Sequence, residues 1–521
     1  MSENQARPHD IIVLGCGLAG SILSLILQAK GYRVKVLHRP KQGLQVGESI
    51  APEASQILLH LSRKYNVTAL KRMTTYESIQ HYYPSVRCYP KRFFHFYFPG
   101  AHEHVYNQMT RYPALADIHA HRPSFDGQLY KLVNEADIDL EVIDSVEQVE
   151  NTADAVHVSY SSGGQSLKTS GSLLIDCTGA ASVVSRLKGW HTKEETLYQV
   201  SCLYSHFKKS PEIPGFDYNR SAATSHFLFK KSWAWHIPID ENTVSFGKLS
   251  LGRGITKEEM IKEVESSEHQ CLDFKEAEWH FIQDLQYRSS QMVDDRIILM
   301  PQAAFLIDPF LSPGVYLAML AIYRIDEMID GLFARGSFKR SEMLSYEQNF
   351  FTEANALQYF FHSFYFTFQQ PALFYAYYEL FRMLVVMNGI SLIPDIEHKV
   401  SHNMFLLGDK RIVNLIRNLH SFLMQADKEG RLDDPQTAST LRKMIHGEGG
   451  FLNPSTGYSK TRASNDYDLP VLSVFKWLAS NWPLRKVFYV FTYLIRRYLR
   501  DIALRIRFFF TSAVKPSASN Y

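Results

Sequence analysis

The stretch Asp10–Arg39, DIIVLGCGLAGSILSLILQAKGYRVKVLHR, decides the first unit of the fold. A short apolar run precedes three glycines, an apolar helical pattern follows them, and RVKVL resumes as a strand. The G-x-G-x-x-G spacing lets the backbone turn tightly and brings a pyrophosphate against the amides of a helix N-terminus. The stretch therefore predicts a βαβ unit that binds a dinucleotide through Gly15, Gly17 and Gly20.

Composition limits the classes of function. The chain has 521 residues, 45% of them hydrophobic and 21% charged, which is typical of a globular protein with a large core. A formal net charge of +3 on this length argues against a nucleic-acid partner. The five cysteines include no C-x-x-C pair, so we expect neither a disulfide framework nor a metal site. No signal-peptide pattern opens the sequence, and we expect a cytoplasmic protein.

Three later motifs indicate that the dinucleotide is FAD. GESIAP follows the βαβ unit, HRPSFDGQLYKLV begins a helix, and LLIDCTGAAS reads as a buried strand that ends in D-x-x-G. In flavoproteins with two dinucleotide-binding folds, such a strand returns beside the first βαβ unit, so a second domain must interrupt the FAD domain. The cofactor-binding residues predicted from these motifs are Glu48, Ser49, Arg122, Asp176 and Gly179.

One position departs from the usual dinucleotide pattern. The second predicted strand ends in Leu37-His38-Arg39, where an acidic residue usually meets the ribose hydroxyls. We therefore expect another partner for the adenosine ribose, or a lower affinity.

The order of these motifs predicts an α/β fold. We expect a two-dinucleotide-binding-fold FAD domain with an inserted mixed β-sheet substrate domain and a C-terminal helical region. The core would span about residues 1–395, with FAD segments at about 8–60, 120–190 and 285–335 and substrate-domain segments at about 61–119 and 191–284. A mainly helical region would occupy about residues 396–521.

Two further motifs point to a family. WAWHIP, Trp233 to Pro238, and AAFLIDPFLSPGVYLA follow the FAD motifs in order, over about residues 10–330. In these motifs the chain resembles the flavin-dependent halogenases, within the larger group of FAD-dependent monooxygenase-like proteins, and it carries their W-x-W-x-I-P signature in full. The resemblance implies an oxidoreductase that uses FADH2, dioxygen and chloride or bromide to make hypohalous acid for electrophilic halogenation.

The resemblance gives Trp233 and Trp235 a catalytic role. Bulky indoles beside the flavin would keep an organic substrate away from it while leaving room for a halide. From the alternation alone, the better explanation is a strand that turns both indoles to the core.

A lysine is the third catalytic candidate. The family places a lysine that binds the hypohalous acid, or becomes a haloamine, between the GES motif and the arginine-bearing helix. YPKRFFHFYFPG, Tyr89 to Gly100, is similar to that segment and makes Lys91 the candidate. A lysine desolvated among aromatic rings has a lowered pKa and is a better nucleophile. Lys71 and Arg92 are the neighbouring alternatives, each of them explained as a surface charge.

The segment Ile298–Leu320 completes the expected site. Backbone amides at its S-x-G turn, at a helix N-terminus, would suit both the flavin carbonyl and a halide ion. The family's G-D dipeptide is replaced here by Pro301-Gln302, so either the Gln302 amide oxygen takes over from the aspartate or FAD binds weakly. From this segment we predict cofactor contacts at Gln302, Asp308 and Val315 and halide contacts at Ser312, Pro313 and Gly314.

The substrate class is only partly indicated. Tryptophan-specific members carry a glutamate where this chain has Leu311, which disfavours free tryptophan. The aromatic segment Tyr359–Val386 either lines a substrate cavity or packs the core. We expect a phenol, pyrrole or resorcinol-like substrate, free or tethered to an acyl or peptidyl carrier protein. Because no second G-x-G-x-x-G unit is present, a separate flavin reductase is expected to supply reduced FAD.

Two other functions stay open. One is an FAD-dependent monooxygenase or oxidoreductase acting on a lipophilic substrate, and the other is a degenerate, non-catalytic flavin-fold binding protein. In the basic aromatic segment 483–510, Arg496, Arg497 and Arg500 interrupt the apolar run, so it is not a transmembrane helix. The segment reads either as an interfacial helix on anionic lipid, which would make the protein membrane-peripheral, or as a helix docked on its own domain.

Overall fold

The computed structural model covers the predicted core and part of the region after it. The described residues are 9–40, 43–91, 93–99, 103–108, 117–208, 222–266, 277–368, 370–398, 402–446, 488 and 492. Among them, no helix has the length and apolar character needed to cross a membrane. The predicted interfacial segment 483–510 lies outside the described residues except at Phe488 and Thr492.

An eight-stranded sheet contains the predicted βαβ unit. β1 (His9–Leu14) pairs in parallel with β2 (Val34–His38), and α1 (Leu18–Ala29) makes the crossover between them. On its other side, β1 pairs in parallel with β11 (Gln165–Asp176). The order is β19-β20-β11-β1-β2-β8, and β9 and β10 extend β11 as an antiparallel ribbon. The remaining strands are β8 (Asp139–Val142), β9 (Ser145–Asn151), β10 (Val156–Ser162), β19 (Val293–Asp294) and β20 (Ile297–Leu299).

Helices pack around this sheet. α1 contacts α5 (Arg122–Glu135) and the long helix α9 (Pro313–Arg335), which also packs on α2 (Pro52–Lys64). The shorter helices nearby are α3 (Thr68–Lys71), α4 (Tyr76–Tyr82), α6 (Val183–Leu187) and α8 (Pro301–Ala304). The apolar residues of β1 from position 11 to 14 are fully buried, as expected for a parallel strand covered on both faces.

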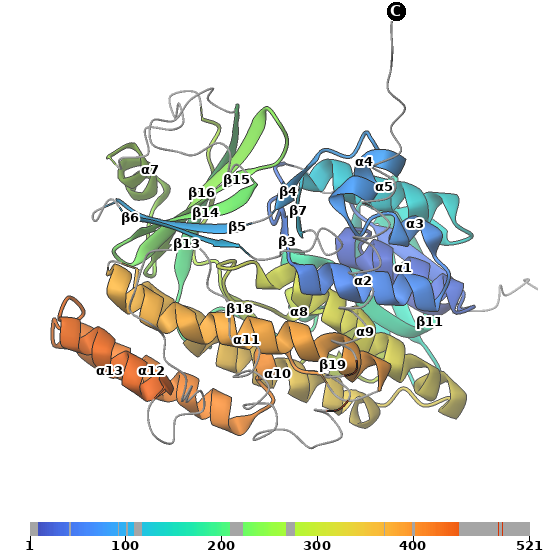
Figure 1. Cartoon of the computed structure of the whole chain (residues 1–521). Coiled ribbons are helices and arrows are strands. Elements are labelled where there is room, and N and C mark those ends of the chain that lie inside the picture. The colour runs from blue at the N-terminus through green and yellow to red at the C-terminus, as the bar shows by residue number, and fades with distance from the viewer. Residues whose placement is uncertain are drawn as a thin grey trace, which may run out of the picture.

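A seven-stranded mixed sheet forms the second unit, drawn in green and blue at the upper left of Figure 1. Its order is β17-β13-β16-β15-β14-β5-β6, and only the β14–β5 pair in it is parallel. The strands are β5 (Phe93–Phe98), β6 (Glu103–Gln108), β13 (Val200–Lys208), β14 (Ala223–Phe229), β15 (Ser232–Pro238), β16 (Thr243–Leu251) and β17 (His280–Ile282). Helix α7 (Lys257–Ser266) packs on β13 and β16.

Two small sheets complete the strands of the described chain. In the first, β7 (Asp117–Ala120) lies between β3 (Ser49–Ile50) and β4 (Cys88–Lys91), so that the GES motif and Lys91 flank the same strand. In the second, β18 (Tyr287–Ser289) lies between β12 (His191–Thr192) and β21 (Phe305–Leu306). These pairings confirm the predicted fold class, a two-dinucleotide-binding-fold α/β protein with an inserted mixed sheet and a helical region near the C-terminus.

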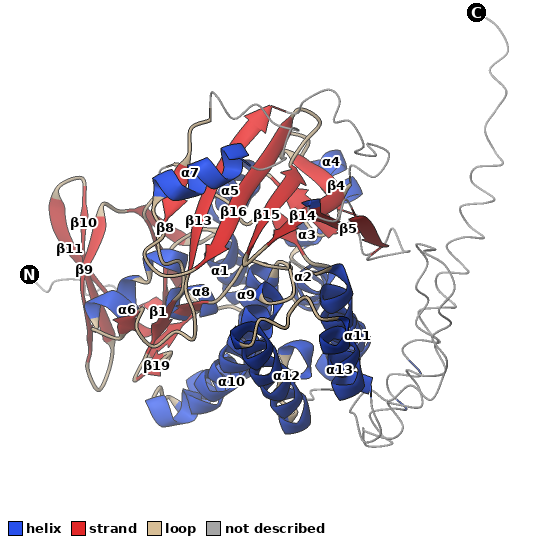
Figure 2. Ribbon diagram, turned by 90° about the vertical axis from the view of Figure 1, so that its left-hand side faces the viewer, coloured by secondary structure: helices blue, strands red, loops and turns tan. Residues whose placement is uncertain are grey.

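Four helices form a layer along one side of the molecule, at the bottom of both Figure 1 and Figure 2. They are α10 (Arg340–Tyr365), α11 (Pro371–Glu397), α12 (Lys410–Lys428) and α13 (Pro435–His446). α10 packs on α12, and α11 packs on α13. The layer therefore begins at α10, and α11 crosses the boundary expected near residue 396. The reason is physical, since the aromatic side chains of α10 and α11 bury themselves against both units of the core.

Candidate active site

The glycine loop takes the shape that the G-x-G-x-x-G spacing predicts. Gly15 has φ +93°, and a Cβ placed on it would lie 2.9 Å from the Cys177 carbonyl oxygen. A Cβ on Gly20 would overlap the Gly15 carbonyl. The first glycine thus permits the turn and the third permits close packing of the helix on the turn.

The N-terminus of α1 fits the pyrophosphate of a dinucleotide. Gly17 is its N-cap and carries no capping side chain, so the first-turn amides keep their donors for an anion. The Arg122 guanidinium forms a two-pronged ion pair with Asp126, at 3.0 and 2.9 Å, and also donates to the Gly47 carbonyl at 3.2 Å. A Cβ placed on Gly17 would lie 3.8 Å from Asp126 Oδ2, so the glycine loop, the GES segment and the Arg122 helix are neighbours. Their joint role in binding FAD stays a prediction.

The predicted residues of the GES motif are buried between two sheets. The Glu48 carboxylate accepts the Gly47 N–H at 2.8 Å and contacts His206 Nε2 at 3.1 Å. Ser49 Oγ lies 3.4 Å from Thr224 Oγ1 on β14, which in turn lies 2.8 Å from His119 Nε2. The motif therefore links the FAD-type unit to the seven-stranded sheet.

Asp176 and Gly179 shape the turn after β11. Asp176 is fully buried, and its carboxylate accepts the Thr178 N–H, the Thr178 hydroxyl and the Val184 N–H at 2.6 to 2.9 Å. Gly179 has φ +62°. The structure explains Asp176 by these local hydrogen bonds, and a direct contact with the cofactor stays a prediction.

The predicted halide segment lies at an open helix N-terminus. Ser312 is the N-cap of the 23-residue helix α9, Pro313 is its first residue, Gly314 is exposed and Val315 is half-buried. Leu311 and Ser312 both have positive φ, 61° and 62°, which is strained backbone for residues with a Cβ. Strain of this kind persists where the surrounding fold imposes it, and no side chain caps this helix N-terminus.

Gln302 reaches the same helix terminus. Its side-chain amide donates a hydrogen bond to the Gly314 carbonyl oxygen, while the Tyr287 hydroxyl donates to its backbone carbonyl. Gln302 therefore holds α8 and the start of α9 together. That the Gln302 amide oxygen takes over from the family's aspartate stays a prediction.

Both tryptophans of WAWHIP lie on β15 and are buried, with 2% and 6% of their surfaces exposed. Their ring centroids are 5.9 Å apart, as expected for residues on one face of a strand. The Trp233 Nε1–H donates to the Tyr365 hydroxyl at 3.1 Å, and the Trp235 Nε1–H donates to Ser245 Oγ at 3.0 Å. Trp235 also covers Gly247, where an added Cβ would overlap the indole.

Lys91 is fully buried at the end of β4. Its Nζ lies 4.6 Å from the centroid of the Phe94 ring. Burial, followed by the positive charge of Lys91, lowers the pKa of His119 well below its usual range. Burial, with a further contribution from Lys91, also lowers the pKa of His226 to about 3. These two histidines are therefore neutral at physiological pH.

Glu53 is a site residue that sequence reasoning missed. It lies in the first turn of α2 and is 6% exposed. Burial raises the pKa of its carboxyl, and the nearby Lys91 charge opposes that rise. Glu53 therefore lies close enough to Lys91 for the Lys91 charge to act on its carboxyl. The signal that could have found it is an acidic residue directly after GESIAP, among apolar neighbours.

Aromatic rings connect Lys91 to the tryptophans. The Phe94 ring that Lys91 covers contacts the His226 ring at 5.4 Å between centroids, and His226 contacts the Trp233 indole at 5.5 Å. Phe310, from the DPF motif, contacts both His226 and Trp233 at 5.2 and 5.0 Å. Three motifs that are far apart in the sequence thus meet around His226.

The aromatic segment Tyr359–Val386 packs the core where it is described. Among its side chains, Phe360, Phe361, Phe364, Tyr365 and Tyr377 are each no more than 1% exposed. Their rings contact one another and those of β5, for example Phe96 with Phe374 at 5.0 Å. This observation favours the core-packing alternative for these residues.

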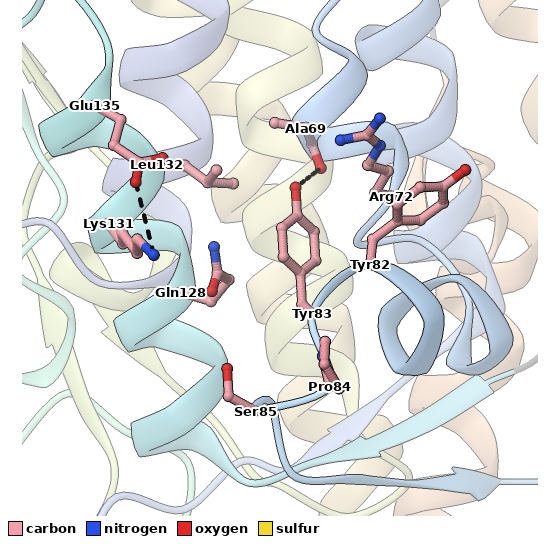
Figure 3. Close-up of a pocket in the computed structure, with 10 residues that line it drawn as sticks. All are labelled: Ala69, Arg72, Tyr82, Tyr83, Pro84, Ser85, Gln128, Lys131, Leu132 and Glu135. Atoms are coloured by element: carbon pink, nitrogen blue, oxygen red, sulfur yellow. Dashed lines mark hydrogen bonds and ion pairs between the residues drawn. The ribbon is translucent and has the colours of Figure 1, made fainter.

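One surface pocket lies away from these groups. Figure 3 shows it between the end of α4 and one side of α5. Arg72 lies over the Tyr82 ring at 4.2 Å, and Lys131 pairs with Glu135 at 3.7 Å. No predicted site residue lines this pocket. Among the described residues there is also no cluster of side chains suited to a metal ion.

The chain is similar in sequence to curated halogenases. The monodechloroaminopyrrolnitrin halogenase PrnC of Pseudomonas fluorescens is 25% identical over 354 residues, which cover 62% of this chain and 62% of PrnC. The chain therefore spans about three fifths of the length of that relative. A 1H-pyrrole-2-carbonyl-[peptidyl-carrier protein] chlorinase of the same species is 23% identical over 371 residues, covering 65% of this chain and 79% of the chlorinase.

Solved structures show the same fold. The crystal structure of halogenase PltM in complex with phloroglucinol and FAD superposes with a TM-score of 0.71 at 19% identity, and the match covers 84% of this chain and 95% of PltM. The tryptophan halogenase family model matches residues 115–378, half of the chain. That stretch includes Arg122, both tryptophans and the DPF motif, and the chain belongs to the tryptophan halogenase family.

Proposed function

We propose that the protein is a flavin-dependent halogenase that uses reduced FAD, dioxygen and chloride or bromide to halogenate an electron-rich aromatic substrate. The observation that carries the proposal is the convergence of Lys91, Trp233 and Phe310 on the buried His226 ring. The buried Lys91 side chain, which the Phe94 and His226 rings connect to the Trp233 indole, suits a small, polarisable halogen species better than a large charged substrate.

FAD would be held by the amides of the α1 N-terminus, with Arg122 and Glu48 fixing the loops around it. When bound and reduced, FAD would supply the two electrons that bring dioxygen to the peroxide level. Oxygen at that level would oxidise the halide to hypohalous acid, with water as the other product. The N-terminus of α9 offers a halide its partial positive charge and the backbone N–H groups of Gly314 and Val315, since Pro313 has no N–H and the Ser312 N–H donates to the Pro309 carbonyl. The side chains of Trp233 and Trp235 exclude a bulky organic substrate from their own face of β15.

Lys91 would bind the hypohalous acid at its oxygen. An ammonium N–H donated to that oxygen makes it a better leaving group, so that the aromatic carbon takes the halogen and the oxygen departs as water. The aromatic C–H is replaced by a carbon–halogen bond, and the released proton is taken up in forming water.

We propose a phenol, pyrrole or resorcinol-like substrate, either free or bound to a carrier protein. Leu311 stands where tryptophan-specific members have a glutamate, and it is buried and apolar here. The name of the pyrrole chlorinase supports an electron-rich ring bound to a carrier protein, and the name of the phloroglucinol complex supports a free one. A separate flavin reductase is proposed as the source of reduced FAD.

The test is incubation of the purified chain with FAD, a flavin reductase, NADH and either chloride or bromide. The substrates are a panel of phenols, pyrroles and resorcinols and a pyrrolyl carrier protein, and mass spectrometry reads the isotope pattern of the products. We expect halogenated product that depends on Lys91, with the exposed Lys71→Met variant as a matched control. Hydroxylated product without halogen would support the monooxygenase alternative and contradict the proposal.

A further inference from the structure

A chain of hydrogen bonds joins the WAWHIP strand to the helical layer. The Trp233 Nε1–H on β15 donates to the Tyr365 hydroxyl oxygen on α10 at 3.1 Å. The Tyr365 hydroxyl donates in turn to Asp308 Oδ2, after β21, at 2.8 Å. All three residues are buried, with 2%, 1% and 3% exposed. These hydrogen bonds are therefore shielded from solvent, and a donor that loses its partner here has no bulk water to bind instead.

The direction of this chain is determined by its two ends. An indole N–H can only donate, an ionised carboxylate can only accept, and a phenol hydroxyl does both. Tyr365 is thus the one member able to accept from Trp233 and donate to Asp308. Asp308 keeps two other donors, the Tyr198 hydroxyl at 3.2 Å and the Phe310 N–H at 2.9 Å. Removing the Tyr365 hydroxyl would therefore leave the indole N–H without an acceptor, while the Asp308 carboxylate would keep two donors.

The two indoles of the signature are held in different ways. Trp235 donates to Ser245 on the neighbouring strand β16, so its orientation is set within the seven-stranded sheet. Trp233 depends on a side chain from α10, which lies 132 positions away in the sequence. Of the pair, Trp233 is the one whose position the helical layer controls.

A second set of contacts ties the same helix to the predicted halide segment. The Phe310 ring lies 5.0 Å from Trp233 and 5.0 Å from each of Phe364 and Phe368. Phe310 directly precedes the strained residues Leu311 and Ser312 at the start of α9. A displacement of α10 at Tyr365 would consequently move the indole, and Phe310 would carry the effect to the halide segment.

We propose that Tyr365, oriented by Asp308, is a positioning residue that fixes the Trp233 indole, and that the helical layer thereby sets the geometry of halogenation. The inference rests on the proposed function. It assigns a role in the reaction to a residue outside every sequence motif that identified the family.

The test compares Tyr365→Phe with Tyr377→Phe. Tyr377 is a matched control because it is fully buried among the same rings, and its hydroxyl donates only to the Phe360 carbonyl, at 3.2 Å, within the described chain. The primary measurement is how turnover of reduced flavin divides between halogenated product and hydrogen peroxide. We expect Tyr365→Phe to lower the ratio of product to peroxide about 3- to 10-fold, the effect of one buried hydrogen bond. FAD affinity should stay the same, and Tyr377→Phe should divide its turnover like the wild type.

A double-mutant comparison separates positioning from general loosening. In a Trp233→Phe background there is no indole to orient, so Tyr365→Phe should cause no further fall in the ratio. An equal fall in both backgrounds, or a Tyr377→Phe variant that matches Tyr365→Phe, would overturn the inference.

A spectroscopic measurement does not depend on the folding of any Tyr365 variant. The ultraviolet resonance Raman difference between the wild type and Trp233→Phe isolates the N–H band of this indole. We expect the frequency of a hydrogen-bonded N–H, and the frequency of a free N–H would contradict the inference. A wild type that yields no halogenated product contradicts the proposed function, whereas halogenation with an unchanged ratio in Tyr365→Phe contradicts only the positioning role.

Discussion

Two regions of the molecule differ in what forms them: the predicted cofactor side, around the glycine loop, and the predicted halogenation side, around Lys91 and Trp233. The predicted cofactor side consists of backbone and of glycines without side chains, at Gly15, Gly17 and Gly20. The halogenation side consists of buried side chains, with Lys91 fully enclosed and Trp233 2% exposed. The difference teaches that a contiguous motif can specify the first kind of site, whereas the second needs side chains from several elements to meet.

The largest effect is expected from a substitution at Lys91, which should impair halogenation without impairing FAD binding. Replacing Lys91 with Met removes the buried ammonium group and should lower the halogenation rate by at least about 100-fold, as for loss of a group that assists proton movement. FAD affinity, measured by flavin fluorescence, should change less than about twofold because the glycine loop does not contact Lys91. Retained halogenation in Lys91→Met would remove Lys91 from the site.

The pH dependence of stability tests the buried environment of Asp308. Burial raises the pKa of its carboxyl from 3.8 to about 6 in the folded protein. The native state therefore holds this proton to a higher pH than the unfolded chain, and the stability it contributes is lost as pH rises from below 4 to above 6. Between pH 4 and 7, the difference in unfolding free energy between the wild type and Asp308→Asn should change by roughly 2 kcal/mol. A flat difference curve in chemical denaturation would contradict this assignment.

The glycine loop can be broken without touching the halogenation side. A Cβ at Gly20 would overlap the rigid Gly15 carbonyl, so Gly20→Ala should destabilise the protein by about 1–3 kcal/mol and weaken FAD binding. Gly127→Ala is the control, because Gly127 lies within helix α5 and has open space around its Cβ. That variant should be neutral or gain about 0.5–1 kcal/mol from its higher helix propensity, as read from thermal melts.

The smallest expected effect concerns the second indole. Gly247→Ala would push a methyl group into the Trp235 ring, which can shift more easily than backbone, and we expect a loss of about 1 kcal/mol. Combining it with Trp235→Phe should relieve part of that loss, so the two changes should be less than additive in unfolding free energy. Strict additivity would mean that the indole does not lie on Gly247.

The fold could be predicted where local pattern and packing agree. The run before Gly15, the helix after it and the strand that ends at Asp176 carry period and turn signals, and the structure pairs β1 with β2 and β11 as those signals imply. The boundary of the helical layer could not be predicted, because an aromatic helix in a core and one lining a cavity have the same pattern. Only the contacts of α10 and α11 show where their rings lie.

By itself, the sequence determined the glycine turns, the WAWHIP strand and the family. Each of these depends on neighbours within a few positions, through backbone conformation or strand alternation. The tertiary structure alone decided that Glu53 lies close to Lys91, that three motifs meet at His226 and that Tyr365 holds Trp233. Such pairs join residues from distant parts of the chain, and a buried polar group takes whichever partner the packing of whole elements brings within hydrogen-bond distance.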